Sequence, residues 1–466
     1  MTTGPMGKHA RRLAIGLLAA STLAPVSAAA QAKESVEDRL DRLEAMIVAM
    51  QQQMQGGQTG AAQAETVEEL RAALAETKAQ NQAIAAQQAS TEERVAQVEK
   101  NDANGFRVGD TTVKIGGYAK LDAKSLRTSA GQLPGDSLGR DFLIPSLIPV
   151  GGESSGWDTH FHARQTRLIV STSTPVGDSA VGTHLEMDFL ATAGGDQRVS
   201  NSYSPRVRQA FITYDGWTFG QAWSNFQNTG ALPDSVDFVG TMPGTVFVRQ
   251  PLIRYKTKSG FSISAENPET TLTTGTGGRI LPSDDKLPDF TVRYDGSNFT
   301  VAGILRQLTA SDTVLGATDG ASTLGYGVSV SGKLPIGGNG DDLRVMATVG
   351  EGLGRYMGAN IVNDAAITPD GDLEAIATYS GSAAFRHVWS PKARSSIGGS
   401  YFKADNPVDL TGGSPTDEVW NAFGNFIYSP VPKLDLGIEY MYAERTNEAG
   451  LDGNLQQVQF MAKYAF

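Results

Sequence analysis

Basic side chains alternate with apolar ones in several short stretches of the second half of the chain. In the stretch 251–258, Arg254 and Lys256 alternate with Ile253 and Tyr255. A period of two is that of a β-strand, so the two cations project from one face and the apolar side chains from the other. Guanidinium groups bind carboxylates through pairs of parallel hydrogen bonds. Recognition of anions is therefore the chemistry that such a face could perform.

The same alternation recurs in other stretches and assigns their charged residues to the polar face. Apolar neighbours flank Arg293 in 289–296 and Arg344 in 341–350. Two stretches, those of Arg167 and Arg208, can be read in either register. The remaining charged residues assigned to the polar face are Arg306, Arg386, Lys463, Glu186, Asp188, Asp435 and Glu439. The polar face is mixed in charge, with basic residues on more strands than acidic ones.

Sixteen stretches of the chain show the alternation of a β-strand. They begin near 113, 160, 181, 206, 217, 251, 260, 289, 298, 324, 341, 377, 393, 417, 432 and 454. Short turns such as DGW, KSG, GSN and SPVP alternate with long segments. Short and long connections that alternate over an even number of strands are typical of an outer-membrane barrel. A water-soluble β-sandwich is the alternative, but it has no reason to sort its connections in this way.

The fold class predicted is all-β, a sixteen-stranded antiparallel transmembrane β-barrel preceded by an α-helical coiled-coil segment. An arginine that faces lipid near the middle of the bilayer costs about 2–4 kcal/mol, so the cations are expected to face inward. A barrel of this size encloses an aqueous channel. The named cations would then line a pore.

The N-terminus predicts export. MTTGPMGKHARR is basic, LAIGLLAASTLA is a short apolar core, and Ala28 and Ala30 fit a cleavage site, so residues 1–30 are expected to be a signal peptide. No later stretch approaches about 18 consecutive apolar residues, so no transmembrane helix is expected. A net charge of -11 gives no support for nucleic-acid binding. The predicted location is the bacterial outer membrane, with the segment 31–105 in the periplasm.

Residues 31–105 carry the predicted coiled coil. Apolar residues at heptad spacing run from Val36 to Met54, and a second seam in another register runs from Val67 to Val98. The glycine-rich GGQTG, residues 56–60, separates the two as a hinge. Asn81 falls on the second seam, where a polar residue can fix the register or the oligomeric state. The alternative is a disordered tether.

The barrel is expected to occupy 106–466 and to end with its last strand. Val458, Phe460, Ala462, Tyr464 and Phe466 share one face of that strand. A closed sheet pairs every backbone group in hydrocarbon, so the last strand ends where it meets the first. Tyr464 and the terminal Phe466 resemble the signal read by the outer-membrane assembly machinery.

The third long segment, 224–250, is rich in apolar residues and is expected to fold into the barrel as a constriction. Its Asp234, Asp237 and Arg249 would then lie in or near the narrowest part of the pore. The alternative is that the segment packs on a neighbouring subunit. Acidic clusters in other long segments, such as Asp284-Asp285, could hold calcium or cations that bridge lipopolysaccharide, although a solvated rim is the more common interpretation.

Catalysis is not expected. His160 and His162 lie at the start of the second strand, with no G-x-S-x-G or comparable nucleophile motif nearby. They could form a weak metal site, but histidines at the barrel rim are the more common interpretation. The sequence therefore predicts no enzyme, no cofactor and no metal.

Several strings resemble one known family. RVRQAFITYDGWTFGQAWSNF, GTMPGTVFVRQPLIRY, KIGGYAKLDAK and HARQTRLIV are similar to the DcaP-like porins, and the likeness covers about 113–466. The resemblance implies a homotrimer of sixteen-stranded barrels, a periplasmic coiled coil and uptake of small anionic compounds, dicarboxylates among them. On that analogy Arg167, Arg208, Arg249 and Arg254 are the expected solute contacts.

Two functions remain open at this point. The first is passive diffusion of small, preferably anionic solutes. The second is an outer-membrane anchor whose coiled coil binds peptidoglycan or a periplasmic partner. An anchor needs neither a basic lumen nor an inward segment, so the lining of the barrel discriminates between them.

Overall fold

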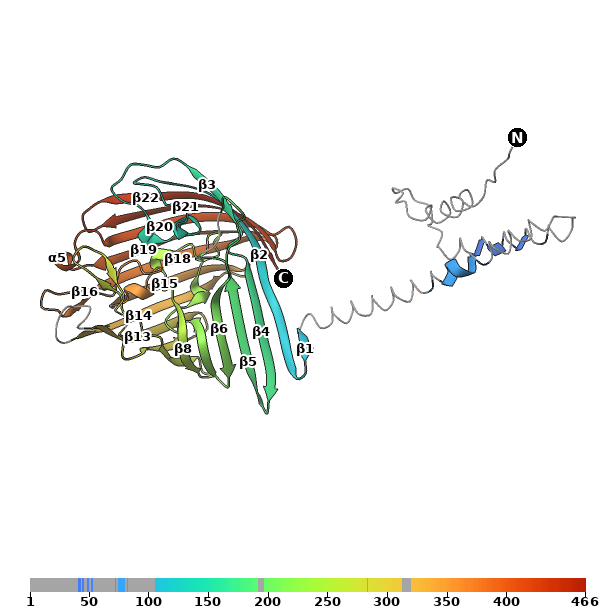
Figure 1. Cartoon of the computed structure of the whole chain (residues 1–466), viewed down its shortest axis with the longest axis horizontal. Helices are drawn as coiled ribbons and strands as arrows, with labels where there is room; N and C mark the ends of the chain where they lie inside the picture. Colours follow the sequence, from blue (N-terminus) through green and yellow to red (C-terminus); the bar gives the residue numbers. More distant parts are fainter. Residues whose placement is uncertain are drawn as a thin grey trace, which may run out of the picture. The chain divides into compact units, whose positions relative to one another are not determined.

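The computed structural model describes residues 105–191, 197–282, 284–311 and 320–466, together with helical residues scattered between 41 and 82. The chain divides into two units, 1–100 and 101–466. The second unit is a β-barrel (Figure 1).

Eighteen strands among the described residues form one sheet. In chain order they are β1 (Phe106–Val108), β2 (Thr111–Thr128), β3 (Asp158–His162), β4 (Arg167–Val176), β5 (Ser179–Asp188), β6 (Arg206–Tyr214), β7 (Trp217–Trp223), β8 (Arg249–Lys256), β9 (Phe261–Glu266), β12 (Asp289–Asp295), β13 (Phe299–Ala310), β14 (Ala321–Ile336), β15 (Asp341–Glu351), β18 (Ala377–Ser390), β19 (Ala393–Asp405), β20 (Thr416–Tyr428), β21 (Leu434–Asn447) and β22 (Asp452–Ala465).

These strands fill sixteen positions around a closed antiparallel barrel. β3 and β4 pair with successive parts of β2 and so act as one interrupted strand. The three-residue β1 forms a hairpin with the start of β2. The sheet closes where β2 pairs with β22, from Tyr118 opposite Ala465 to Thr128 opposite Leu455 (Figure 1). Because no edge is left at this junction, the backbone groups of the first and last strands are paired.

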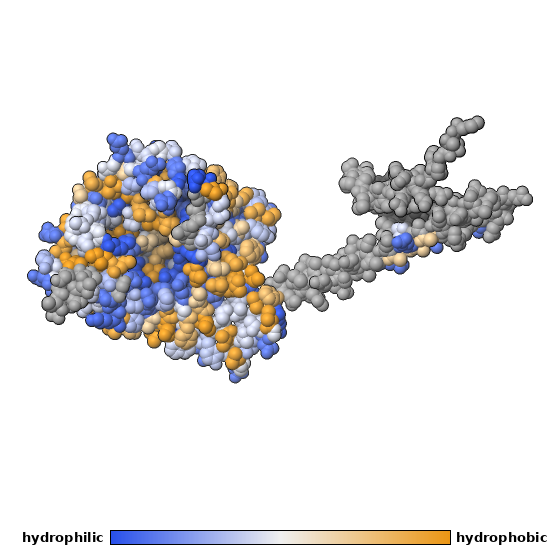
Figure 2. Space-filling model, in the orientation of Figure 1, coloured by the Kyte–Doolittle hydropathy of each residue, from blue (hydrophilic) through white to orange (hydrophobic). Residues whose placement is uncertain are grey.

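The predicted barrel is confirmed, and the strands begin within three residues of the predicted positions. The local reason is the alternation of side chains. On β14, for example, Val328 and Val330 are exposed whereas Ser329 and Ser331 are buried. Hydrophobic residues are accordingly spread over the outside of the barrel (Figure 2). In a membrane protein this exposed apolar surface is the surface that meets lipid.

Two long segments carry structure that the sequence did not predict. β10 (Leu272–Thr273), β11 (Arg279–Ile280), β16 (Ala365–Ile367) and β17 (Leu373–Ala375) form a separate four-stranded sheet. It packs around Leu272, Leu308 and Ala365. The short helix α5 (Val408–Thr411) and five 3-10 turns, η1 (Leu138–Arg140), η2 (Pro145–Leu147), η3 (Thr229–Ala231), η4 (Met242–Gly244) and η5 (Gly354–Tyr356), complete the connections.

The first unit contains helical residues from 41 to 52 and from 72 to 82. Lys78 Nζ lies 3.1 Å from Asp41 Oδ1 and also contacts Glu44, so the two helical stretches meet within this unit. None of the described helices is long and apolar enough to cross a membrane. The predicted signal peptide, the hinge at 56–60 and the seam position Asn81 lie outside the described residues, and the coiled coil stays a prediction.

Candidate solute pathway in the barrel lumen

The segment between β7 and β8 runs along the inside of the barrel. Its first half is held by arginines of the wall. Arg293 Nη1 on β12 donates to the carbonyl of Gln227 at 2.6 Å, and Arg344 Nη1 on β15 donates to that of Leu232 at 2.5 Å. We call residues 224–248 the inner segment.

The tip of the inner segment is held by the far side of the wall. Glu439 on β21 accepts hydrogen bonds from the backbone N–H groups of Val236 (2.8 Å) and Asp237 (3.2 Å). Lys120 Nζ on β2 donates to the carbonyl of Val236 at 3.0 Å. Because its contacts come from β12, β15, β21 and β2, the inner segment extends across the lumen and narrows it.

Both acids predicted near the constriction are paired with cations of the wall. Asp234 Oδ2 lies 2.7 Å from Arg394 Nε and 3.9 Å from Arg386 Nη1. Asp237 Oδ1 lies 3.3 Å from Lys124 Nζ. Each carboxylate thus fastens the inner segment to a different part of the barrel.

The structure settles the register of the strands of Arg167 and Arg208. Arg167 Nη1 and Arg208 Nε contact the same carboxylate oxygen of Glu186, at 3.0 and 2.5 Å. Arg208 also pairs with Asp188 at 2.9 Å, and Arg206 pairs with Asp188 at 2.6 Å. Three arginines therefore share two carboxylates, and this wall cluster keeps one positive charge in excess.

The guanidinium of Arg306 on β13 links long connections to the barrel wall. Its guanidinium pairs with Asp289 (3.0 Å) and Asp364 (2.7 Å) and donates to the carbonyls of Gly352 and Glu269. The Tyr356 hydroxyl also donates to Asp289 at 2.7 Å. Burial raises the pKa of Tyr356 well above its ordinary value, so the hydroxyl stays protonated as a donor. The structure points to a structural role for Arg306 rather than to solute contact.

Four other predicted cations pair with neighbouring carboxylates. Lys256 and Arg293 share Asp295, at 2.8 and 2.7 Å. Arg344 and Arg386 share Asp342, at 2.6 and 2.9 Å. Lys333 lies a further 3.8 Å from Asp342, so each of these two carboxylates meets more than one cation.

Arg254 differs from these residues. It lies on the register of β8 opposite to the exposed Ile253, and its contact is the Trp223 carbonyl at 3.5 Å. Among the ion pairs of the described part of the chain, none brings a carboxylate within 4.0 Å of Arg254. Its guanidinium thus keeps most of its donors for another group.

Arg249 packs against Trp223 and against Phe247 of the inner segment. It shares the register of Ile253, which is 52% exposed. Its guanidinium stacks over Trp223 at 4.6 Å, and Arg208 lies 5.8 Å from the same ring. Arg249 therefore joins the cluster around Arg208. Strand alternation alone gives Arg249 the parity of the outward-facing Ile253, but its guanidinium contacts Trp223 and Phe247 beside the luminal cluster.

Sequence reasoning missed further luminal cations of the described residues, among them Arg206 of the wall cluster. Lys120 and Lys124 alternate with the apolar residues of β2, and Arg394 pairs with Asp435 at 3.0 Å. Arg445 on β21 donates to Thr416 Oγ1 at 2.8 Å and to the carbonyl of Ile148 at 2.9 Å. Period-two alternation from Glu439 would have assigned Arg445 to the lumen.

The last residues close the barrel with their aromatic side chains outward. Tyr464 and Phe466 are both exposed. The backbone N–H of Phe466 donates to the carbonyl of Gly117 at 3.1 Å, so the terminal residue is fastened to the first long strand.

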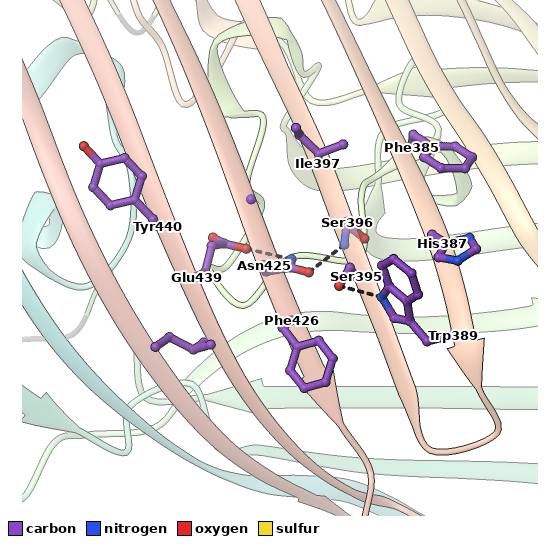
Figure 3. A pocket seen from close by; sticks show the side chains of 12 residues that line it. Phe385, His387, Trp389, Ser395, Ser396, Ile397, Asn425, Phe426, Glu439 and Tyr440 are labelled. Carbon is purple, nitrogen blue, oxygen red and sulfur yellow. Dashed lines mark hydrogen bonds between the residues drawn. The ribbon is translucent and has the colours of Figure 1, made fainter.

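The outer wall carries an apolar hollow of about 630 Å³ over β18–β21. Figure 3 shows Phe385, Ile397, Phe426 and Tyr440 around it. Behind the hollow, Asn425 Nδ2 donates to Glu439 at 3.0 Å, which links this wall to the carboxylate that holds the inner segment. The apolar lining fits contact with lipid and is separate from the polar lumen.

The fold resembles that of a solved outer membrane channel. A solved structure of the outer membrane channel DcaP of Acinetobacter baumannii is 26% identical, with a TM-score of 0.64, and the match covers 78% of this chain and 100% of that one. The OmpT protein of Vibrio cholerae with loop L8 deleted is 16% identical, with a TM-score of 0.45 over 77% of this chain and 100% of that one. No curated protein sequence matches.

The sequence profile of the DcaP outer membrane protein family matches residues 146–466, which is more than half of the chain. The match includes β4 to β22, the inner segment and most of the luminal cations described above. The chain belongs to the DcaP outer membrane protein family.

Proposed function

We propose that the protein is a passive outer-membrane channel for small solutes that prefers anions, with dicarboxylates as the substrate class. The observation that carries the preference is Arg254, an inward-facing guanidinium without a carboxylate partner among the described residues. Its planar donors match a carboxylate of the solute. The related protein of A. baumannii is described as an outer membrane channel, which supports the channel function.

The arrangement of ion pairs adds to this preference. The Arg167, Arg206 and Arg208 cluster has three cations for two acids. Asp295 meets two cations and Asp342 meets three, of which Arg386 also lies 3.9 Å from Asp234. Basic residues that line a pore favour anions. A solute with two carboxylates could contact Arg254 and the excess charge of a neighbouring cluster in succession.

The inner segment is proposed as the constriction. It crosses the lumen, and the pairs of Asp234 and Asp237 with wall cations fix its position. Both acids would therefore shape the pore, while Lys256, Arg293, Arg344 and Arg386 set its potential. In this proposal Arg306 contributes to stability and Arg249 to the cluster around Arg208.

The remaining proposals concern assembly. We propose that the protein forms a homotrimer in the outer membrane, in contact with lipid and lipopolysaccharide. Tyr464 and Phe466, exposed at the end of β22, would be read by the assembly machinery. Residues 1–30 would be removed on export, 31–105 would form a periplasmic coiled coil, and 106–466 would form the barrel. No part of this proposal involves catalysis, a cofactor or nucleic acid.

The test is a planar-bilayer recording of the purified protein in asymmetric KCl, followed by addition of succinate. We expect conductance steps in groups of three, a reversal potential that indicates anion selectivity, and current noise that depends on succinate. Correctly folded, heat-modifiable protein without conductance would contradict the channel and favour an anchor that binds peptidoglycan through the coiled coil. A cation-selective reversal potential would contradict only the anion preference.

A further inference from the structure

Two histidines and one aspartate converge on the inner side of β3. His160 and His162 are two residues apart on one strand and so share its inward face. Asp141 comes from the connection that follows η1. One ligand atom from each of the three residues lies within 4.8 Å of the other two. His162 Nε2 and Asp141 Oδ1 are 3.7 Å apart.

Both imidazoles are buried, and neither forms a hydrogen bond with another side chain among the described residues. His160 is 4% exposed and His162 is 5% exposed, whereas the sequence analysis expected rim histidines. Neither ring nitrogen of His162 has a hydrogen-bond partner among the described residues, and His160 is approached only by the backbone of Arg140. Buried polar groups of native proteins are nearly always paired, so an unpaired cluster of this kind indicates a ligand.

Two carboxylates face the His162 ring, one at each nitrogen. Asp122 Oδ2 is fully buried, lacks a partner in the described structure and lies 4.0 Å from His162 Nδ1. His162 can therefore present Nε2 toward Asp141 while Nδ1–H faces Asp122. Histidines that bind metals commonly donate their second N–H to a carboxylate in this way.

The cations nearby are occupied by other partners. Arg164 pairs with the second oxygen of Asp141, and Lys120 pairs with the second oxygen of Asp122 at 3.0 Å. Lys124 pairs with Asp237, and Arg140 pairs with Asp158. Asp141 Oδ1 and Asp122 Oδ2 therefore remain directed at the imidazoles.

We propose that Asp141, His160 and His162 bind a divalent first-row transition-metal ion, with Asp122 as a positioning residue. Zinc ligands at about 2.0–2.2 Å from the ion require donor atoms about 3.4 Å apart, so the observed spacing of 3.7–4.8 Å closes with side-chain shifts of about 1 Å. Two imidazoles and one carboxylate suit zinc and its neighbours, with positions left open for water. A bound ion would fasten the 129–157 connection to the barrel wall.

The test uses the full-length protein in detergent, purified through a tag without histidine. Titration with ZnCl₂ in a calorimeter is expected to show one site per chain. Of the five histidines of the chain, His9 lies in the predicted signal peptide, which leaves His160, His162, His184 and His387. The double variant His160→Ala/His162→Ala should lose the site, and the matched control His184→Ala/His387→Ala should keep it.

Further measurements test the positioning role of Asp122 and the folding of the variants. Asp122→Asn should weaken zinc binding about 10–100-fold without removing the site. Co²⁺ added to the unmodified protein should give the visible ligand-field bands of nitrogen ligation, and these bands do not depend on whether any variant folds. Heat-modifiable migration in a gel shows that each variant has kept the barrel.

Three outcomes would overturn the proposal. The first is the absence of zinc binding to the unmodified protein, which would mean that water fills the cluster. The second is equal binding by the His160/His162 double variant and by the unmodified protein. The third is a cobalt spectrum of oxygen ligands alone.

Discussion

The carboxylate of Glu439 on β21 accepts a hydrogen bond from the backbone N–H of Val236 at 2.8 Å and so ties the tip of the inner segment to the barrel wall. The same carboxylate accepts hydrogen bonds from Asp237 N, Ser235 Oγ and Asn425 Nδ2. Glu439 is 1% exposed, so these bonds face little competition from water. Four donors therefore converge on this one carboxylate, three of them from the inner segment.

Replacement of Glu439 by alanine is expected to release the inner segment. Hydrogen bonds to charged groups contribute about 1.5–3 kcal/mol each, and several are lost together. Single-channel conductance and open-channel noise should both rise in bilayer recordings. Glu444→Ala is the control, because Glu444 lies on the same strand and contacts Tyr442 rather than the inner segment. Unchanged conductance of Glu439→Ala would show that the segment does not limit the pore.

Arg254→Glu is expected to reduce anion preference. The substitution inverts a charge on the inner face of β8, where the arginine has no carboxylate partner in the described structure. The reversal potential in asymmetric KCl should move toward the cation side, and the succinate response should weaken. Arg127→Glu makes the same change of charge at an exposed residue of β2 and should have a small effect. If both variants behave alike, Arg254 does not lie on the solute pathway.

Arg306→Met is expected to destabilise the barrel by about 3–5 kcal/mol, because buried Asp364 loses its cation and buried Asp289 keeps only Arg355, at 3.5 Å. Arg306→Lys should restore stability only in part, since an ammonium cannot reproduce the planar guanidinium fork. Urea unfolding in lipid vesicles measures both variants. Arg127→Lys, at an exposed site, should remain within about 0.5 kcal/mol. A change in selectivity without loss of stability would point to solute contact by Arg306 instead.

Phe466→Ala is expected to lower the amount of protein assembled in the outer membrane. The side chain is exposed, and the backbone of Phe466 keeps its bond to Gly117, so the barrel itself should still form from urea in detergent. The comparison is between yield in membranes and yield of refolding in vitro. Tyr401→Ala, an outward aromatic residue of β19, is the control. A parallel loss in both assays would indicate a folding defect rather than a lost assembly signal.

The sequence by itself determined the strands and most of their faces. The alternation of Arg254 with Ile253 and Tyr255 is a local property, because successive side chains of a strand point to opposite sides whatever lies around them. The closure of the barrel could also be predicted from the sequence, because a strand edge with unpaired backbone groups is not tolerated in the membrane. For these reasons the sixteen positions and the last strand could be predicted.

The tertiary structure decided which charged side chains have an ion-pair partner and which do not. Arg306 meets Asp364 from 58 residues away, and Arg394 meets Asp234 from 160 residues away. No spacing in the sequence indicates such pairs, because they depend on where the long connections fold back into the lumen. The burial of His160 and His162 likewise depends on the long 129–157 connection, which brings Asp141 beside them. The folded chain also decides where the carboxylates lie, and in the described structure none of them pairs with Arg254.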